Sequence, residues 1–170
     1  MEPSAFTQKN KMLLLGLSLF GNPFALKNDW TEENEICGLW KRFMNMLSTS
    51  QRLRRYFSCE TSFYEICVLR DEAASKGLFE TFIGIEINDI NLAPYDMLVK
   101  TLPSSDYAIF TLEGKRIETD WRREIYREWL PGSGYQEAFG FSLQLYDYRF
   151  KGFQNIEDSI IDVYIPVKPM

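Results

Sequence analysis

The last third of the sequence contains three elements in a fixed order, and this order constrains the fold more than any short motif does. The run Ile117–Leu130 is predicted to be a helix, and its apolar residues recur every four positions: Ile117, Trp121, Ile125 and Trp129. Pro131–Gly134 ends this helix, because proline lacks an amide proton and glycine adopts left-handed dihedrals. Two strands are predicted after this stop, over Phe141–Phe150 and Ile160–Lys168.

The same order of elements occurs earlier in the chain. The first half is predicted to contain strand Met12–Phe20, a helix from Asp29 to Leu47, and strands Phe63–Arg70 and Phe79–Ile87. A strand at Asp106–Leu112 opens the second half, after a connection that contains Pro94 and Pro103. The N-terminal segment Met1–Lys11 is polar and is predicted to be a loose end.

This repetition predicts an α+β fold with one domain, residues 1–170, built from two β-α-β-β repeats at about 11–90 and 105–170. Each repeat is expected to form a small antiparallel sheet with one face covered by its helix. We expect a pseudo-twofold axis to relate the two repeats around a central cleft, which is a favoured place for a ligand.

Composition excludes several classes of function. The sequence has no histidine, which rules out Ser-His-Asp and Cys-His catalysis and histidine-ligated zinc. Its three cysteines lack CxxC spacing, so we expect free thiols in a reducing compartment, without a metal or other cofactor. A net charge of −5 argues against direct binding of nucleic acid. The apolar run Met12–Leu17 is too short to span a membrane, and the cytoplasm is therefore the expected location.

Seven segments that begin after about Lys11 have an order and a spacing in common with a known bacterial family. They are Leu39–Phe43, Gly84–Ile87, Asp106–Phe110, Trp121–Pro131, Ser133–Tyr135, Leu145–Phe150 and Asp162–Lys168. Together they resemble the GyrI-like small-molecule-binding domain, the effector-binding domain of AraC- and MerR-type multidrug-sensing regulators of transcription. The resemblance implies the same duplicated β-α-β-β architecture and a pocket for cationic, aromatic, lipophilic molecules.

A buried organic cation requires aromatic faces and a nearby carboxylate. In the family an acid commonly lies two residues before the tyrosine of the strand that corresponds to Leu143–Asp147, but this chain has Gln144 there. Our leading candidate for the carboxylate that neutralises a cation is Glu86, at the matching place in the last strand of the first half. Glu86 shares a strand face there with Phe82. A solvent-facing position on an edge strand is an equal alternative for Glu86. Two weaker candidates, each expected at the surface, are Glu65 and Asp147.

Strand alternation also selects the aromatic wall of the expected pocket. Tyr146 and Tyr148 share a strand face with Gln144. Further candidates, for which ordinary core packing is an equal alternative, are Tyr64, Phe82, Tyr107 and Tyr164. Core packing is the stronger interpretation for three tryptophans on regular helix faces, Trp121, Trp129 and Trp40. Of these, Trp121 stays a candidate for the pocket.

Only about ten residues precede the first predicted strand, so the resemblance implies a stand-alone binding module without the DNA-reading segment of those regulators. Such a module would sequester a small molecule, deliver it, or report it to a transcription regulator or other protein in trans. Two alternatives remain open. The chain could be a small hydrolase in which Glu86 acts as general base, or an interaction protein like the family's gyrase inhibitor.

Overall fold

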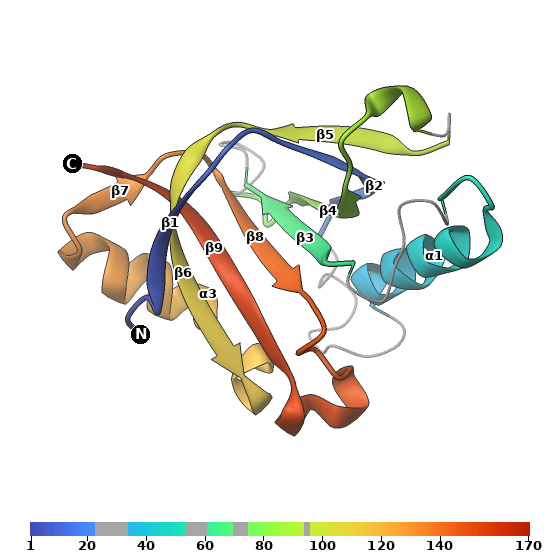
Figure 1. Ribbon diagram of the computed structural model, residues 1–170. Coiled ribbons are helices and arrows are strands. Elements are labelled where there is room, and N and C mark those ends of the chain that lie inside the picture. The colour runs from blue at the N-terminus through green and yellow to red at the C-terminus, as the bar shows by residue number, and fades with distance from the viewer. Residues whose placement is uncertain (23–33, 54–60, 70–74, 94–95) are drawn as a thin grey trace.

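The computed structural model describes residues 1–22, 34–53, 61–69, 75–93 and 96–170, which form an α+β fold dominated by one antiparallel sheet (Figure 1). The strands are β1 (Ala5–Lys9), β2 (Met12–Gly21), β3 (Phe63–Val68), β4 (Phe79–Glu86), β5 (Leu98–Leu102), β6 (Ser105–Glu113), β7 (Tyr135–Glu137), β8 (Phe141–Tyr146) and β9 (Ile160–Pro169). They lie in the order β1-β6-β9-β8-β3-β4-β2-β5, and β7 pairs with β9. The α+β class predicted from the sequence is confirmed.

The pairing of β3 with β8 joins the two halves of the chain into one sheet, where the sequence predicts two small sheets. A separate sheet in each half would leave an unpaired strand edge at this junction, and the β3–β8 pairing removes both edges. The register sets Glu65 of β3 directly opposite Gln144 of β8, although 79 residues separate them in the sequence. This junction positions the site described below.

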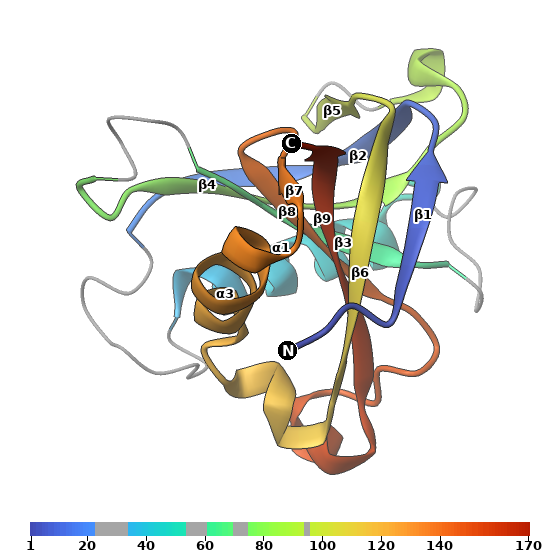
Figure 2. The same ribbon diagram turned by 90° about the vertical axis from the view of Figure 1, so that its left-hand side faces the viewer.

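Two strands that the sequence analysis missed form the edges of the sheet. β1 lies within the segment predicted to be a loose end and pairs with β6, while β5 lies in the connection before β6 and pairs with β2. Only Asn10 and Lys11 separate β1 from β2, although these strands lie far apart in the strand order. The sheet therefore curls strongly, and Figure 2 shows β2 and β4 running across the direction of β6 and β9.

Helix α1 (Glu35–Thr49) covers the first half of the sheet. It begins at Asn34, whose side chain accepts a hydrogen bond of 2.8 Å from the backbone amide of Ile36. The predicted start at Asp29 lies outside the described residues. The buried face of α1 packs against β2 and β4 and consists of Ile36, Leu39, Phe43 and Leu47.

A second helical run covers the other half of the sheet, on the same side as α1 (Figure 2). It consists of the 3₁₀ helix η3 (Gly114–Glu118), α3 (Trp121–Arg123), the π-helical η4 (Glu124–Trp129) and η5 (Leu130–Gly132). The sequence predicts one continuous α-helix here. A spacing of four residues slightly exceeds the 3.6-residue turn of an α-helix, and the wider π turn accommodates it while Trp121, Ile125 and Trp129 all stay buried.

The opposite face of the curled sheet closes on a second apolar core. Side chains from both ends of the strand order meet there, because the sheet bends around them. They include Met12 and Leu102 from β2 and β5, and Tyr107 and Tyr164 from β6 and β9. Both faces of the sheet are therefore buried over much of its area.

Candidate functional site

The site lies on the helix-covered face of the sheet, at the β3–β8 junction. Side chains alternate along a strand, so the register that pairs Glu65 with Gln144 and Phe63 with Tyr146 points these four side chains to the same face. Trp40 of α1 contacts this group of side chains: its indole nitrogen bonds Glu65, and its ring packs against Phe63 and Tyr146. The site thus draws on one helix and on one strand from each half of the chain.

The Glu65 carboxylate is buried, with 3% of the residue exposed, and both of its oxygens accept hydrogen bonds. The indole Nε1 of Trp40 donates to Oε2 at 2.8 Å, and Nε2 of Gln144 donates to Oε1 at 3.0 Å. The Tyr146 hydroxyl in turn donates to Oε1 of Gln144 at 3.3 Å. The three direct and indirect donors are neutral groups, so they satisfy the carboxylate without cancelling its charge.

Burial raises the pKa of Glu65 above its usual range, because an ionised carboxylate loses its hydration in the core. The hydrogen bond from Trp40, the positive charge of Arg122 and the hydrogen bond from Gln144 oppose this rise without cancelling it. Burial also raises the pKa of Tyr146 well above 10, and the negative charge of Glu65 adds to this rise. Tyr146 therefore remains a neutral hydrogen-bond donor at physiological pH.

An aromatic cavity of about 580 Å³ opens beside this carboxylate. It is lined by Cys37, Trp40, Lys41, Met44, Phe63, Tyr146, Asp147 and residues 150–155. Trp40 and Tyr146 line the cavity and also belong to the hydrogen-bond network around Glu65, which itself is not a lining residue. The two rings therefore separate the acid from the open space.

The aromatic lining forms a continuous series of edge-to-face contacts. The ring centroids of Trp40 and Tyr146 are 5.3 Å apart, with 70° between the planes. The series extends from Tyr146 to Phe150 at 4.9 Å and from Phe150 to Phe153 at 5.4 Å. Phe153 is 46% exposed, so the aromatic surface runs from the buried acid to the mouth of the cavity. Such a lining suits flat apolar molecules.

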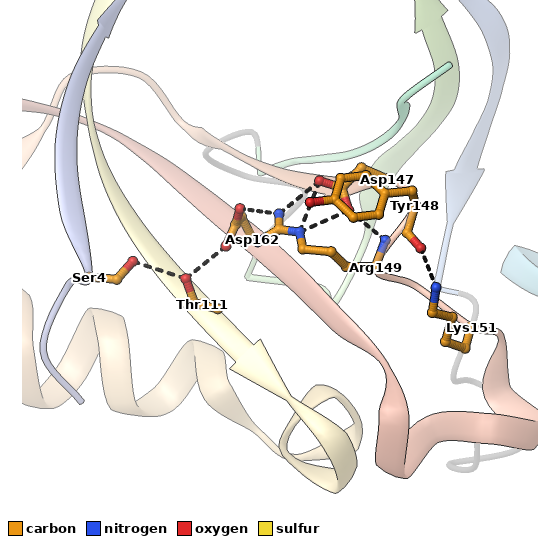
Figure 3. Close-up of polar contacts among 7 residues, drawn as sticks. All are labelled: Ser4, Thr111, Asp147, Tyr148, Arg149, Lys151 and Asp162. Atoms are coloured by element: carbon orange, nitrogen blue, oxygen red, sulfur yellow. Dashed lines mark hydrogen bonds and ion pairs between the residues drawn. The ribbon is translucent and has the colours of Figure 1, made fainter. Parts of the chain in front are cut away.

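The other wall of the cavity is a turn that Arg149 holds in place (Figure 3). Arg149 Nε donates to both carboxylate oxygens of Asp147, at 2.9 and 3.0 Å, and its terminal nitrogen donates to Asp162 of β9. Asp162 also accepts from the Thr111 hydroxyl at 2.8 Å, and Ser4 lies 3.0 Å from that hydroxyl. The network fixes the turn to β9 and β6. It also neutralises Asp147, which cannot serve a ligand without breaking its pairing with Arg149.

The structure divides the candidate residues predicted from the sequence between the two faces of the sheet. Glu65, Gln144 and Tyr146 lie together on the helix-covered face at the cavity. The residues on the opposite face are Tyr64, Phe82, Glu86, Tyr107 and Tyr164.

Glu86 is exposed on that opposite face and accepts a hydrogen bond from the Tyr64 hydroxyl at 3.4 Å. The strand that carries Glu86 is not an edge strand, because β4 lies between β3 and β2. Phe82, Tyr107 and Tyr164 belong to the apolar core of that face. None of these side chains lines the cavity.

The remaining two predicted residues lie apart from the cavity. The sequence predicts a strand through Phe150, but β8 ends at Tyr146 because Asp147 and Arg149 form the turn. Tyr148 consequently leaves the strand face and is 77% exposed. Trp121 is 2% exposed in the core below α3, and the guanidinium of Arg122 lies 4.2 Å from its ring centroid.

Sequence reasoning assigned Trp40 to the core and did not single out Phe63, Phe150 or Phe153. Trp40 follows the buried residues of α1 at helical spacing, but it is only partly buried because it sits at the margin of that face. Its indole N–H needs an acceptor when buried, which is a usable signal, but the sequence does not indicate that the acceptor is Glu65.

No group of three or more Cys, Asp or Glu side chains among the described residues could hold a metal ion. No helix in the described part of the chain has the length and apolar character needed to cross a membrane.

Comparison with known proteins places this geometry in a family. Residues 6–167 match the family described as Cass2, the integron-associated effector binding protein. The transcriptional regulator BrlR of Pseudomonas aeruginosa is 28% identical over 130 residues, which are 76% of this chain and 45% of BrlR. The chain thus spans less than half the length of this relative.

Among solved structures, SAV2435 bound to tetraphenylphosphonium is similar with a TM-score of 0.68 at 18% identity, covering 99% of this chain and 94% of that one. An integron cassette protein from the mobile metagenome of Vibrio cholerae gives 0.61 at 11% identity, covering 96% and 95%. EcmrR in complex with DNA gives 0.63 at 11% identity, covering 98% of this chain and 57% of EcmrR. With the family match extending over nearly its whole length, the chain belongs to the Cass2 family of effector-binding proteins, whose domain is GyrI-like.

Proposed function

We propose that this protein binds cationic, aromatic, lipophilic small molecules in the cavity beside Glu65. The observation that carries the proposal is a buried carboxylate held by neutral donors, directly behind the aromatic rings of an open cavity. Burying a carboxylate costs free energy unless its charge is compensated. A ligand that brings a positive charge to this place recovers part of that cost.

Trp40 and Tyr146 connect the carboxylate to the ligand. A cation placed over an aromatic face gains about 0.5–2 kcal/mol, depending on how far the site excludes water. The Trp40 indole donates its N–H to Glu65, and a hydrogen bond to an anion polarises the ring so that its face becomes more negative. The carboxylate therefore attracts a cation both directly through space and through the Trp40 ring.

A similar protein supports this ligand class. SAV2435 has been solved with tetraphenylphosphonium, a molecule that combines a positive charge with four phenyl rings. The cavity of this chain has an aromatic lining, and the buried acid Glu65 lies behind two of its rings, which suits a molecule of this kind. The net charge of −5 adds a weak, salt-screened attraction for cations.

The proposal includes the organisation of the chain as one domain of two related halves. In both halves the third strand lies between the first and the second, in the orders β3-β4-β2 and β8-β9-β6. This shared order supports a duplicated β-α-β-β unit with pseudo-twofold symmetry. The cavity would then lie where the two halves meet.

We further propose that the protein acts in the cytoplasm and that a transcription regulator or another protein reads its loaded state. BrlR is a transcriptional regulator and EcmrR has been solved bound to DNA, and this chain matches a part of each. The acidic charge of the chain favours a protein partner over direct contact with nucleic acid.

The test is a fluorescence titration with a cationic dye and a neutral dye of the same ring shape, for the wild type and for Glu65→Gln. We expect the wild type to prefer the cation, and Glu65→Gln to weaken cation binding by at least about tenfold, or ~1.4 kcal/mol, with little change for the neutral dye. Glu86→Gln is the matched control, because it removes an exposed carboxylate on the opposite face. Equal affinity for both dyes in the wild type would rule out the proposal.

A second candidate is a small hydrolase in which Glu65, rather than the exposed Glu86, acts as general base. The position of Glu65 beside a cavity favours it, because burial raises the pKa of this carboxylate and makes it a stronger base than an exposed one. The test is product formation from an aryl ester. Turnover that disappears in Glu65→Gln would support the hydrolase, and the absence of turnover in the wild type would reject it.

A further inference from the structure

Lys151 lines the cavity at its mouth. It lies between Phe150 and Phe153, the last two rings of the aromatic series, and it is exposed. Its ammonium donates a hydrogen bond of 2.8 Å to the backbone carbonyl of Tyr148 (Figure 3). Because a carbonyl is neutral, this bond holds the ammonium in place without cancelling its charge. The ammonium also keeps further N–H groups for another acceptor.

The backbone of Lys151 is fixed on both sides. Its N–H donates to the hydroxyl of the buried Ser159 at 2.9 Å, and its carbonyl oxygen accepts from the side-chain amide of Asn155 at 3.3 Å. An exposed lysine normally loses conformational freedom when it pairs with an anion, and this loss makes most surface ion pairs weak. The anchored position of Lys151 reduces that loss, so this lysine is better suited to hold an anion than an ordinary surface lysine.

The rim of the cavity contains positive charge from both of its walls. Lys151 belongs to the turn wall, and Lys41 of α1, which is also exposed, lines the cavity from the helix. None of the carboxylates in the described parts of the chain forms an ion pair with Lys151. Asp147 is the acid among the lining residues, and Arg149 already binds both of its oxygens.

The negative and the positive charge of the site lie at opposite ends of the aromatic series. Glu65 lies behind Trp40 and Tyr146 at the inner end, and Lys151 follows Phe150 at the outer end. A simple aromatic cation is attracted by the inner acid and gains nothing from the positive rim. A molecule that also has an anionic group at the far end of its rings gains at both ends, and the two charges fix its orientation.

We propose that the preferred ligands of this cavity are amphoteric aromatic molecules, whose cationic group is directed towards Glu65 and whose carboxylate binds Lys151. The inference rests on the proposed function, because Lys151 selects only among molecules that enter this cavity. It narrows the ligand class from lipophilic cations to elongated aromatic zwitterions.

The test is a fluorescence titration of the full chain with two dyes that differ at one end. The first is a styrylpyridinium cation with a carboxylate on the ring far from the pyridinium, and the second is the methyl ester of the same dye. We expect the wild type to bind the acid dye about three- to fivefold more tightly than the ester at low salt, the upper range for an exposed ion pair. High salt should reduce this preference, because exposed charges are screened.

Substitutions at Lys151 test whether this residue causes the preference. Lys151→Gln should abolish most of the preference, Lys151→Glu should reverse it in favour of the ester, and Lys151→Arg should retain it. Arg42→Gln is the matched control, because Arg42 is exposed, follows Lys41 on α1 and does not line the cavity. This control removes the same unit of charge and should leave the preference unchanged. Equal midpoints of urea unfolding verify that the variants are folded.

The possible outcomes separate the inference from the proposed function. If the wild type binds neither dye, or if Glu65→Gln leaves both affinities unchanged, the proposed function fails. If both dyes bind in a Glu65-dependent way but with equal affinity, or if Lys151→Gln keeps the full preference, the role of Lys151 is wrong while the proposed function stands. A preference that falls as much in Arg42→Gln as in Lys151→Gln would reflect the overall charge of the protein and would also overturn the inference.

Discussion

Replacing Glu65 by glutamine should stabilise the folded protein at neutral and alkaline pH while it removes cation binding. Glutamine has the shape of a protonated glutamic acid. It can keep the hydrogen bond from Trp40 and can bond to Gln144 after a reorientation of that amide. The variant therefore retains the packing and the hydrogen bonds but loses the buried charge. A site that stores such a cost is typical of a functional position.

The sign of the pH effect follows from the direction of the pKa shift. The pKa of Glu65 is higher in the folded protein than its ordinary value of 4.5, so the folded state holds the proton more tightly than the unfolded chain. The contribution of Glu65 to stability is therefore most favourable below the unfolded value and is lost as the pH rises through the folded value. The Glu65→Gln variant lacks this loss.

The expected size is the cost of burying an incompletely compensated polar group, about 1–3 kcal/mol. A gain of about 2 kcal/mol corresponds to a rise in Tm of about 4–8 °C for a chain of this length. Urea unfolding followed by tryptophan fluorescence at pH values on either side of the transition measures it. We expect the variant and the wild type to have similar stability in acid and to diverge as the pH rises. A variant that is less stable than the wild type at alkaline pH would refute the reasoning, because Glu65 would then stabilise the fold as a charged group.

Three further predictions concern the neighbours of Glu65 and the cavity wall. Trp40→Phe removes the indole donor but keeps a ring, so cationic-dye affinity should fall by about tenfold, since a hydrogen bond to a charged group contributes about 1.5–3 kcal/mol; an unchanged affinity would exclude Trp40 as the link to the acid. Gln144→Glu places a second carboxylate against Glu65, and the two acids should share one proton. Calorimetry should therefore show a stability loss of about 2 kcal/mol or more at alkaline pH that is recovered in acid. A loss of stability that does not depend on pH would contradict this. Arg149→Met leaves the carboxylates of Asp147 and Asp162 without their positive partner, so urea unfolding should show a loss of about 2 kcal/mol in stability. The control Lys115→Met, at an exposed ion pair, should change the stability little. Equal effects of the two substitutions would show that the Arg149 network does not fix the cavity wall.

Several features of the fold follow from local sequence patterns. The positions of β2, β4, β6 and β9 were predictable from short apolar runs between turn residues, and α1 was predictable from apolar residues at steps of three and four. The edge strands β1 and β5 were not predictable, since each is only five residues long and pairs with a single strand, to which it adds at the edge of the sheet. The end of β8 at Tyr146 could not be predicted either, because Arg149, which holds the turn through Asp147, also bonds Asp162 on β9.

The choice of the acid shows where sequence reasoning ends. Alternation along β4 groups Phe82 with Glu86 and Ile83 with Ile85, but both sets contain buried apolar residues, so the pattern does not reveal which face the helices cover. Glu65 could be listed from the sequence only as a weaker alternative, because nothing local brings Trp40 or Gln144 to it. The sequence by itself determined the main strands and helices, their order, the absence of histidine chemistry and the presence of an uncharged glutamine at position 144. Only the tertiary structure decided which carboxylate lies behind the aromatic cavity, because the register between β3 and β8 is a contact between residues 79 positions apart.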